Sequence, residues 1–196
     1  MLKPARIFKP GESGMAAVEF ALIAPFLVAL FFGLVEVCNA LSAHQKVTSV
    51  ASTAADLTAQ ATTVSVSDLN DIFAASSAIM APFSTNDVSI VVTSIAGDGN
   101  RNEGTVLWSQ TNGHGTAHTV GSTISIGDPS KLSSDDQGLL PASCTNSTQC
   151  SIILAEVSYN YTSPYGKFIV GQMDMTDLFY SKPRRVVSVP CTDCSQ

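Results

Sequence analysis

The chain has few charged residues, and this shortage excludes several classes of protein. Asp, Glu, Lys and Arg make up 13% of its 196 residues, about half of the usual share. The 10 Lys and Arg are outnumbered by 16 Asp and Glu, which disfavours a nucleic-acid-binding protein because such a protein needs a basic surface to meet phosphates. At 45%, the share of hydrophobic residues is too high for a disordered chain.

The signatures of common enzymes are also missing. The sequence contains no P-loop, no Gly-x-Ser-x-Gly, no Ser-x-x-Lys and no dinucleotide fingerprint. His114 and His118 are four residues apart, as two metal ligands on a helix would be, but Gly113 and Gly115 make this stretch a loop. We interpret both as solvated loop histidines. We therefore expect no enzyme, no metal site and no cofactor.

One long hydrophobic run stands near the N-terminus. Residues Met15 to Val37 read MAAVEFALIAPFLVALFFGLVEV, with Glu19 and Glu36 as the charged residues. As a helix this run would be about 34 Å long, enough to cross the roughly 30 Å core of a bilayer. Pro25 lies inside it, and membrane helices tolerate proline. A buried helix of a soluble protein would seldom run so long without a polar face. The sequence therefore predicts a transmembrane helix over residues 15–37.

The flanking charges predict the orientation of this helix. The residues before it include three basic side chains and one acidic side chain, namely Lys3, Arg6, Lys9 and Glu12. After it, Lys46 is the only basic residue before Arg101. Because positive charge stays on the cytoplasmic side, we expect the N-terminus in the cytoplasm and the rest of the chain outside.

A secretory signal peptide is a second interpretation of this start. Leu41-Ser42-Ala43 is a poor cleavage site for one, and the apolar run exceeds the usual 7–15 residues. Two residues point to another kind of processing: Gly14 stands just before the apolar run, and Glu19 is the fifth residue after Gly14. A carboxylate inside the first turns of a membrane helix is costly, and therefore indicates a function.

The string Gly14-Met-Ala-Ala-Val-Glu19-Phe20 resembles the processing site of type IV prepilins. The resemblance implies that a prepilin peptidase cuts after Gly14 on the cytoplasmic side and leaves Met15 as the first residue. The longer string, with Pro25 and then Phe32-Gly33-Leu34-Val35-Glu36, resembles the start of TadE-like proteins, the pseudopilins of tight-adherence pilus systems. Met15 stands where Ala is usual, and Phe20 where some members have Tyr.

This resemblance implies a minor pilin that supports biogenesis of a tight-adherence (Flp, type IVb) pilus from the bacterial inner membrane. The implied partners are the prepilin peptidase, other pilin and pseudopilin subunits and the assembly machinery. Glu19, Phe20 and Pro25 would serve assembly, since the Glu19 carboxylate can neutralise the α-amine that cleavage creates on a neighbouring helix. The alternatives are a signal-anchored periplasmic or surface binding protein or adhesin and, less favoured, an exported enzyme.

The exported part divides into a helical region, 38–81, and a mainly β region, 82–196. A shallow stripe of small apolar residues predicts that the first helix continues over Ala40–Ala61. A second helix is expected over Asp68–Met80, with Ser67 or Asp68 as its N-cap and Pro82 after its end.

Seven stretches of the β region read as strands or short apolar pieces. They are Val88–Ile95, Thr105–Gln110, Ser122–Ile126, Ser151–Tyr161, Lys167–Val170, Leu178–Tyr180 and Val186–Val189. With the cytoplasmic leader 1–14, this order predicts an α+β fold: a long N-terminal transmembrane helix, then a pilin-like domain with helix packed on an antiparallel sheet. Glu156-Val-Ser-Tyr-Asn-Tyr161 and Pro183-Arg-Arg185 resemble later elements of TadE-like proteins.

Five cysteines complete the candidate residues. Cys144, Cys150, Cys191 and Cys194 fall on the exported side, where disulfides form. Four cysteines allow three connectivities, and the sequence alone does not choose between them. We favour the pairing 144–150 with 191–194. Cys191-x-x-Cys194 also allows a redox pair or half of a zinc site, although a thioredoxin-like motif would open a helix. Cys38 is left over near the outer boundary of the membrane.

Overall fold

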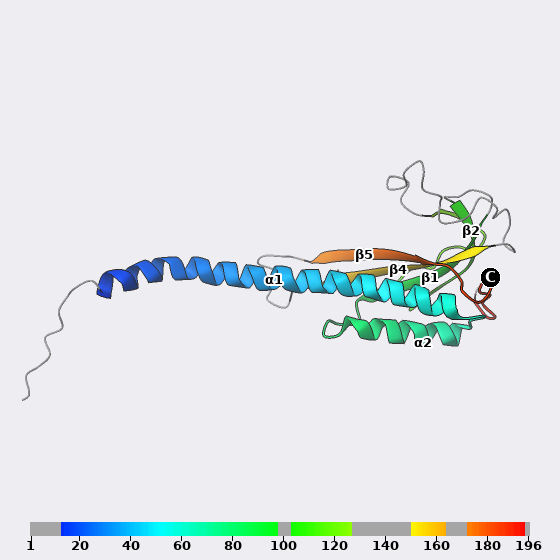
Figure 1. The fold of residues 1–196 in the computed structure, drawn as a ribbon, viewed down its shortest axis with the longest axis horizontal. Coiled ribbons are helices and arrows are strands. Elements are labelled where there is room, and N and C mark those ends of the chain that lie inside the picture. Colours follow the sequence, from blue (N-terminus) through cyan, green and yellow to red (C-terminus); the bar gives the residue numbers. More distant parts are fainter. Residues whose placement is uncertain (1–12, 98–102, 127–149, 164–171, 195–196) are drawn as a thin grey trace, which may run out of the picture.

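A single helix dominates the computed structural model, which describes residues 13–97, 103–126, 150–163 and 172–194. This helix, α1, runs over Ser13–Gln60, about 72 Å at 1.5 Å per residue. Its N-terminal half projects away from the rest of the structure, and its C-terminal half lies along a sheet (Figure 1). The α+β class and the long N-terminal helix that continues beyond the apolar run are therefore confirmed.

The sheet has five antiparallel strands in the order β3-β2-β1-β4-β5. The strands are β1 (Val88–Gly97), β2 (Glu103–Thr111), β3 (Thr123–Ser125), β4 (Ser151–Tyr161) and β5 (Met173–Ser181). The central pair, β1 and β4, is distant in sequence, with Val92 opposite Ala155. β5 forms one edge of the sheet, beside α1 (Figure 1).

The two faces of the sheet have different surroundings. On one face, alternate residues of β1 such as Val88, Ile90 and Val92 are buried in the main core, together with small residues of α1. Ala51 and Ala54 of α1 are fully buried, and their short side chains allow the helix to approach the strands closely. The opposite face has only a small second core, formed by Ile95, Ile126, Ile152 and Leu154.

The second helix, α2, runs over Val66–Ser77 and is followed by a single 3₁₀ turn, Ala78–Met80. The predicted N-cap was wrong, because Ser65 caps this helix. The Ser65 hydroxyl accepts from the Asp68 N–H at 3.2 Å, and the Asp68 carboxylate accepts from the Ser65 N–H at 2.9 Å. This reciprocal pair is a capping box. The bond from the Ser65 side chain, followed by that from its backbone, lowers the pKa of Asp68.

Two expectations about the strands need correction, and one lies outside the described residues. Val186–Val189 does not form a strand, because its carbonyls are bonded by side chains instead of a neighbouring strand: Ser151 Oγ donates to Val187 O, and Trp108 Nε1 to Val189 O. β5 is longer than the expected piece Leu178–Tyr180. Residues 167–170 are not described.

Candidate functional site

The N-terminal half of α1 is a bare apolar rod. Its large side chains are mostly exposed, including Phe20 at 67%, Leu22 at 70% and Phe26 at 74%. Among the described residues, α1 is the one helix long and apolar enough to span a membrane. Exposure of such a large apolar surface to water is unfavourable for a monomer, so this half of α1 needs lipid or other helices around it.

The residues expected at the processing site stand at the free end of this rod. Gly14 is the second residue of α1, and a Cβ added to it would meet nothing within 4 Å. Met15 is 72% exposed, and Glu19, one helical turn further, is exposed as well. Pro25 lies within the helix, where it leaves the Ala21 carbonyl without its usual helical donor. All of them are open to an enzyme or a neighbouring subunit.

The rod ends where the domain begins, at Glu36. This side chain is only 1% exposed, and its Oε1 has no hydrogen-bond partner among the described residues. Tyr161, at the end of β4, is fully buried nearby, and its hydroxyl also lacks a partner in the described part of the chain. Burial, and then the charge of Glu36, raise the pKa of Tyr161. Two segments distant in sequence, Phe32–Glu36 and Glu156–Tyr161, thus meet at the point where the helix enters the domain.

Further along, polar contacts hold α1 on the domain. Lys46 Nζ donates to the Ile79 carbonyl at 2.9 Å, and Thr48 donates to the Asp177 carboxylate of β5. Near the end of α1, the Arg184 guanidinium pairs with Asp56, and the Arg184 N–H donates to Ala59 O at 2.9 Å. The helix is therefore fixed to the sheet along its last 25 residues or so, while the first half is free.

Residues 14–56 match the family model described as TadE-like protein. Over this segment the chain is similar to TadE-like proteins. The match begins at Gly14, covers the exposed rod and Glu36, and ends at Asp56, the partner of Arg184. No curated protein and no solved structure matches the chain.

The family gives the TadE-like chain a general setting. TadE-like proteins are structural proteins associated with tight-adherence pili, and the match over residues 14–56 supports a pilus-associated protein. The exposed apolar half of α1 makes it a membrane-anchored one. The family also implies association with pilus assembly components in general.

Among the described cysteines, Cys38 of α1 is free and exposed, and the others lie in the domain. Cys191 and Cys194 form a disulfide in a C-terminal segment that is bonded to the turn between α1 and α2. Val64 N donates to Pro190 O, and Thr192 N donates to Val64 O, both at 3.0 Å. Cys150 is also disulfide-bonded, and Cys144 lies outside the described residues.

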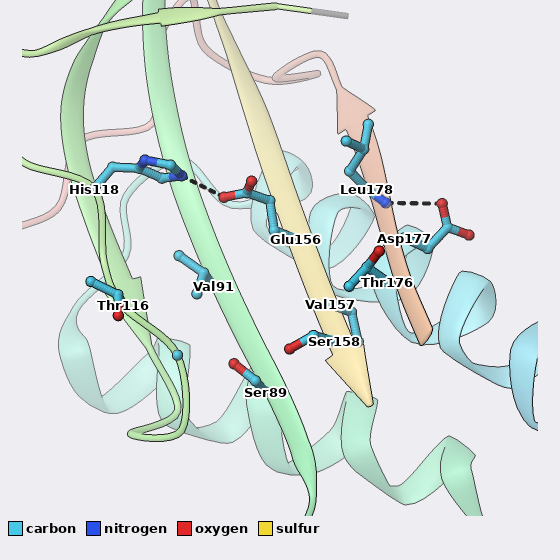
Figure 2. Close-up of a pocket in the computed structure, with 11 residues that line it drawn as sticks. Ser89, Val91, Thr116, His118, Glu156, Val157, Ser158, Thr176, Asp177 and Leu178 are labelled. Atoms are coloured by element: carbon cyan, nitrogen blue, oxygen red, sulfur yellow. Dashed lines mark hydrogen bonds and ion pairs between the residues drawn. The ribbon is translucent and has the colours of Figure 1, made fainter. Parts of the chain in front are cut away.

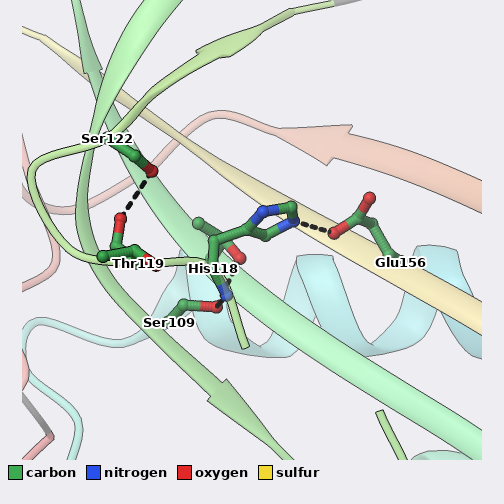
Figure 3. Close-up of polar contacts among 6 residues, drawn as sticks. Ser109, His118, Thr119, Ser122 and Glu156 are labelled. Atoms are coloured by element: carbon green, nitrogen blue, oxygen red, sulfur yellow. Dashed lines mark hydrogen bonds and ion pairs between the residues drawn. The ribbon is translucent and has the colours of Figure 1, made fainter. Parts of the chain in front are cut away.

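The outer face of the sheet, away from α1, carries a polar hollow. His118, on the loop after β2, reaches across β1 to Glu156 on β4, with Nε2 and Oε2 2.5 Å apart (Figure 2). The same loop is fixed by the His118 N–H, which donates to Ser109 Oγ at 3.0 Å (Figure 3). His118 is therefore paired with a carboxylate and is not a solvated loop residue as predicted. In the described part of the chain, no three His, Cys, Asp or Glu residues are grouped to hold a metal.

Sequence reasoning missed the contacts that join distant segments. Neither Glu36 with Tyr161 nor Asp56 with Arg184 has a local spacing that would indicate a pair, since each joins α1 to residues more than 100 positions away. The alternating polar and aromatic residues of Glu156–Tyr161 indicated that this strand has a special role. They gave no indication that Tyr161 lies beside Glu36.

Proposed function

We propose that this TadE-like chain is a pseudopilin that supports assembly of a tight-adherence pilus. It is inserted with residues 1–14 in the cytoplasm, is cut by a prepilin peptidase between Gly14 and Met15, and is held in the inner membrane by the apolar part of α1. Its domain then lies in the periplasm.

The observation that carries this proposal is the free, apolar end of α1 that begins at Gly14. The peptidase must reach the Gly14–Met15 bond, and nothing in the described domain lies near it. Lys3, Arg6 and Lys9 favour retention of the leader in the cytoplasm. Residues 14–35 would cover about 33 Å, which matches the bilayer core and leaves Glu36 to the domain.

The mature N-terminus tests the processing step. The chain should be isolated from cells with an active prepilin peptidase and its N-terminal peptide identified by mass spectrometry. We expect a mature protein that begins at Met15. An intact leader, or a terminus near His44 as a signal peptidase would leave, would refute the proposal.

Gly14→Ala tests recognition of the glycine. We expect it to abolish processing, because the peptidase recognises the residue before the cut. Gly33→Ala is the matched control, because Gly33 lies in the same helix and is equally open to an added Cβ. Equal processing of both variants would contradict the assignment of Gly14.

Glu19 is proposed to act after cleavage, by pairing with the new α-amine of a neighbouring subunit. Glu19→Ala and Glu19→Gln should therefore leave most of the cleavage intact and reduce pilus assembly, which is measured by electron microscopy of sheared fibres. Met15 should still be the first residue of both variants. Normal fibre numbers in both would show that the carboxylate has no such role.

A further inference from the structure

The last described residues of the chain, 186–194, cover part of the main core without forming a helix or a strand. We call them the C-terminal segment. Val189, Cys191 and Cys194 of this segment are at most 7% exposed. Because an irregular buried segment has no ladder of backbone hydrogen bonds, other contacts have to hold it in place.

These contacts join the C-terminal segment to Trp108 of β2 and to the turn between α1 and α2 (Figure 1). Trp108 Nε1 donates to the Val189 carbonyl at 2.8 Å. On the turn, Val64 N donates to Pro190 O, and Thr192 N donates to Val64 O, both at 3.0 Å. The segment residues in these bonds are next to the disulfide or two positions before it, so the disulfide stands at the centre of the contacts.

Asp193, between the two cysteines, adds a contact to the start of α2. Val66, the first residue of α2, donates its N–H to Asp193 Oδ1 at 2.7 Å. The first N–H groups of a helix have no partner within the helix, and a carboxylate is favoured beside them by the helix dipole. The Cys194 N–H donates to Cys191 Sγ at 3.2 Å. The disulfide thus closes a loop of four residues, 191–194, that presents Asp193 to α2.

Neither sulfur is open to an enzyme while the C-terminal segment is in place. Cys191 is 7% and Cys194 is 6% exposed, whereas thiol–disulfide exchange requires a thiolate to reach a sulfur of its partner directly. An enzyme therefore has to act on this pair before the segment packs. In the chain-entropy model, closing a loop of four residues then favours the packed segment by roughly 20-fold.

We infer that Cys191 and Cys194 are the substrate of an exported dithiol oxidase, an enzyme with a reactive disulfide, and that their disulfide closes the C-terminal segment over Trp108 and the start of α2. We call this disulfide the latch. The inference rests on the proposed function, because it requires the domain to lie in the periplasm, where disulfides form. In the reduced chain the segment stays open, so the domain is completed only after export.

The reaction transfers two electrons from the two thiols to the disulfide of the oxidase. The thiolate of one cysteine attacks a sulfur of that disulfide, forms a mixed disulfide and expels the other oxidase sulfur as a thiolate. The thiolate of the second cysteine then attacks the sulfur of the first, which forms the Cys191–Cys194 bond and expels the remaining oxidase sulfur. The two protons of the substrate thiols end on the two sulfurs of the reduced oxidase.

Serine replacements test the latch in the full-length chain, purified in detergent micelles. Cys191→Ser/Cys194→Ser removes the latch, and the matched control, Cys144→Ser/Cys150→Ser, removes two other cysteines of the domain. We expect hydrogen exchange of the Thr192 amide to become at least tenfold faster in the first variant and to stay within twofold of the wild type in the control. Unchanged exchange without the latch, or equal acceleration in both variants, would overturn the inference.

Asp193 variants test the contact with α2 while the disulfide is kept. Asp193→Ala should accelerate hydrogen exchange of the Val66 amide at least tenfold, because this N–H loses its acceptor. Asp193→Asn keeps a side-chain carbonyl at the same place and should restore most of the protection. A Val66 amide that stays protected in Asp193→Ala would show that the loop does not hold α2. Acrylamide quenching of Trp108 should increase only when the latch is removed.

The order of events is measured in cells, with a chain whose other three cysteines are replaced by serine. After a short labelling pulse, the cells are quenched with acid, and free thiols are alkylated with a maleimide. We expect Cys191 and Cys194 to be oxidised before the C-terminal segment becomes resistant to added protease. Resistance in chains with two free thiols would refute the latch. Cys194→Ser in this chain should trap a mixed disulfide between Cys191 and the oxidase, and its absence would refute the enzymatic step.

The same samples separate the latch from the proposed function. A mature terminus at Met15, normal fibres and unchanged Thr192 exchange without the latch refute the latch and leave the proposed function standing. Opening of the C-terminal segment in Cys191→Ser/Cys194→Ser, in a chain whose leader is intact, supports the latch and refutes the processing.

Discussion

Replacing Tyr161 by phenylalanine should make the domain slightly more stable. The Tyr161 hydroxyl is buried and has no hydrogen-bond partner within the residues that the structure describes, a state that costs about 1–3 kcal/mol. Phenylalanine keeps the ring and its edge-to-face contact with Phe83, at 6.1 Å between centroids. We therefore expect the free energy of unfolding to rise by about 1 kcal/mol, which corresponds to a gain in Tm of about 2–4 °C for a domain of this size.

Thermal unfolding of the full chain in detergent micelles measures this change. Trp108 is the only tryptophan in the sequence and is 3% exposed, so its fluorescence follows the core of the domain. Tyr159→Phe is the control, because the hydroxyl of Tyr159 is not an unpartnered buried group, and its removal should give no gain. A loss of more than about 1 kcal/mol in Tyr161→Phe would show that the hydroxyl makes a bond, and would refute the reasoning.

The pH dependence of the free energy of unfolding is a second test of the Tyr161 site. Burial and the charge of Glu36 raise the pKa of Tyr161 above its ordinary value, which is about 10. The folded state then holds this proton more tightly than the unfolded chain does. The resulting stabilisation is present below about pH 10 and is lost as the pH rises through the folded-state pKa. Tyr161→Phe should therefore lose less stability than the wild type above pH 10.

Three other substitutions test the fold elsewhere in the domain. Gly104→Ala should destabilise the domain by about 1–3 kcal/mol in chemical denaturation, because its Cβ would lie 2.6 Å from a backbone oxygen of β1; an unchanged midpoint would contradict this close approach. Ser65→Ala should lower the free energy of unfolding by about 1 kcal/mol. It should also weaken the stabilisation that comes from the lowered pKa of Asp68, which is present at neutral pH and is lost on acidification. Circular dichroism from pH 7 to pH 2 measures both effects. Trp108→Phe should cost about 1–3 kcal/mol, since it leaves the Val189 carbonyl without its 2.8 Å donor; fast hydrogen exchange around Val189 would report the loosened segment.

Much of the fold could be predicted because its signals are local. The run from Met15 has no polar face. The β-branched stretch that begins at Val88 is buried along almost its whole length, and the second half of Ser151–Tyr161 alternates between buried and partly exposed residues. The period at which apolar residues recur shows which positions are buried, and this period distinguishes a helix from a strand. Val186–Val189 shows the limit of this method: three valines in four residues form no strand, because the carbonyls of Val187 and Val189 are bonded by side chains of β4 and β2.

The candidate site divides in the same way. The proposed processing residues Gly14 and Met15 and the proposed assembly residue Glu19 are recognisable in the sequence, because their pattern lies within a few turns of one exposed helix. The pairing of His118 with Glu156 was not predictable, since the loop and the strand are 38 residues apart and neither residue has a spacing that indicates the other.

The sequence by itself therefore determined the apolar helix, its TadE-like start and the α+β class. Each of these depends on the order of residues along a few turns or strands. Only the tertiary structure decided where the membrane helix ends and the domain begins, because the burial of Glu36 depends on a strand more than 100 residues away. It alone also brought His118 to Glu156, since the loop after β2 meets β4 only after the sheet has placed β1 between these two strands.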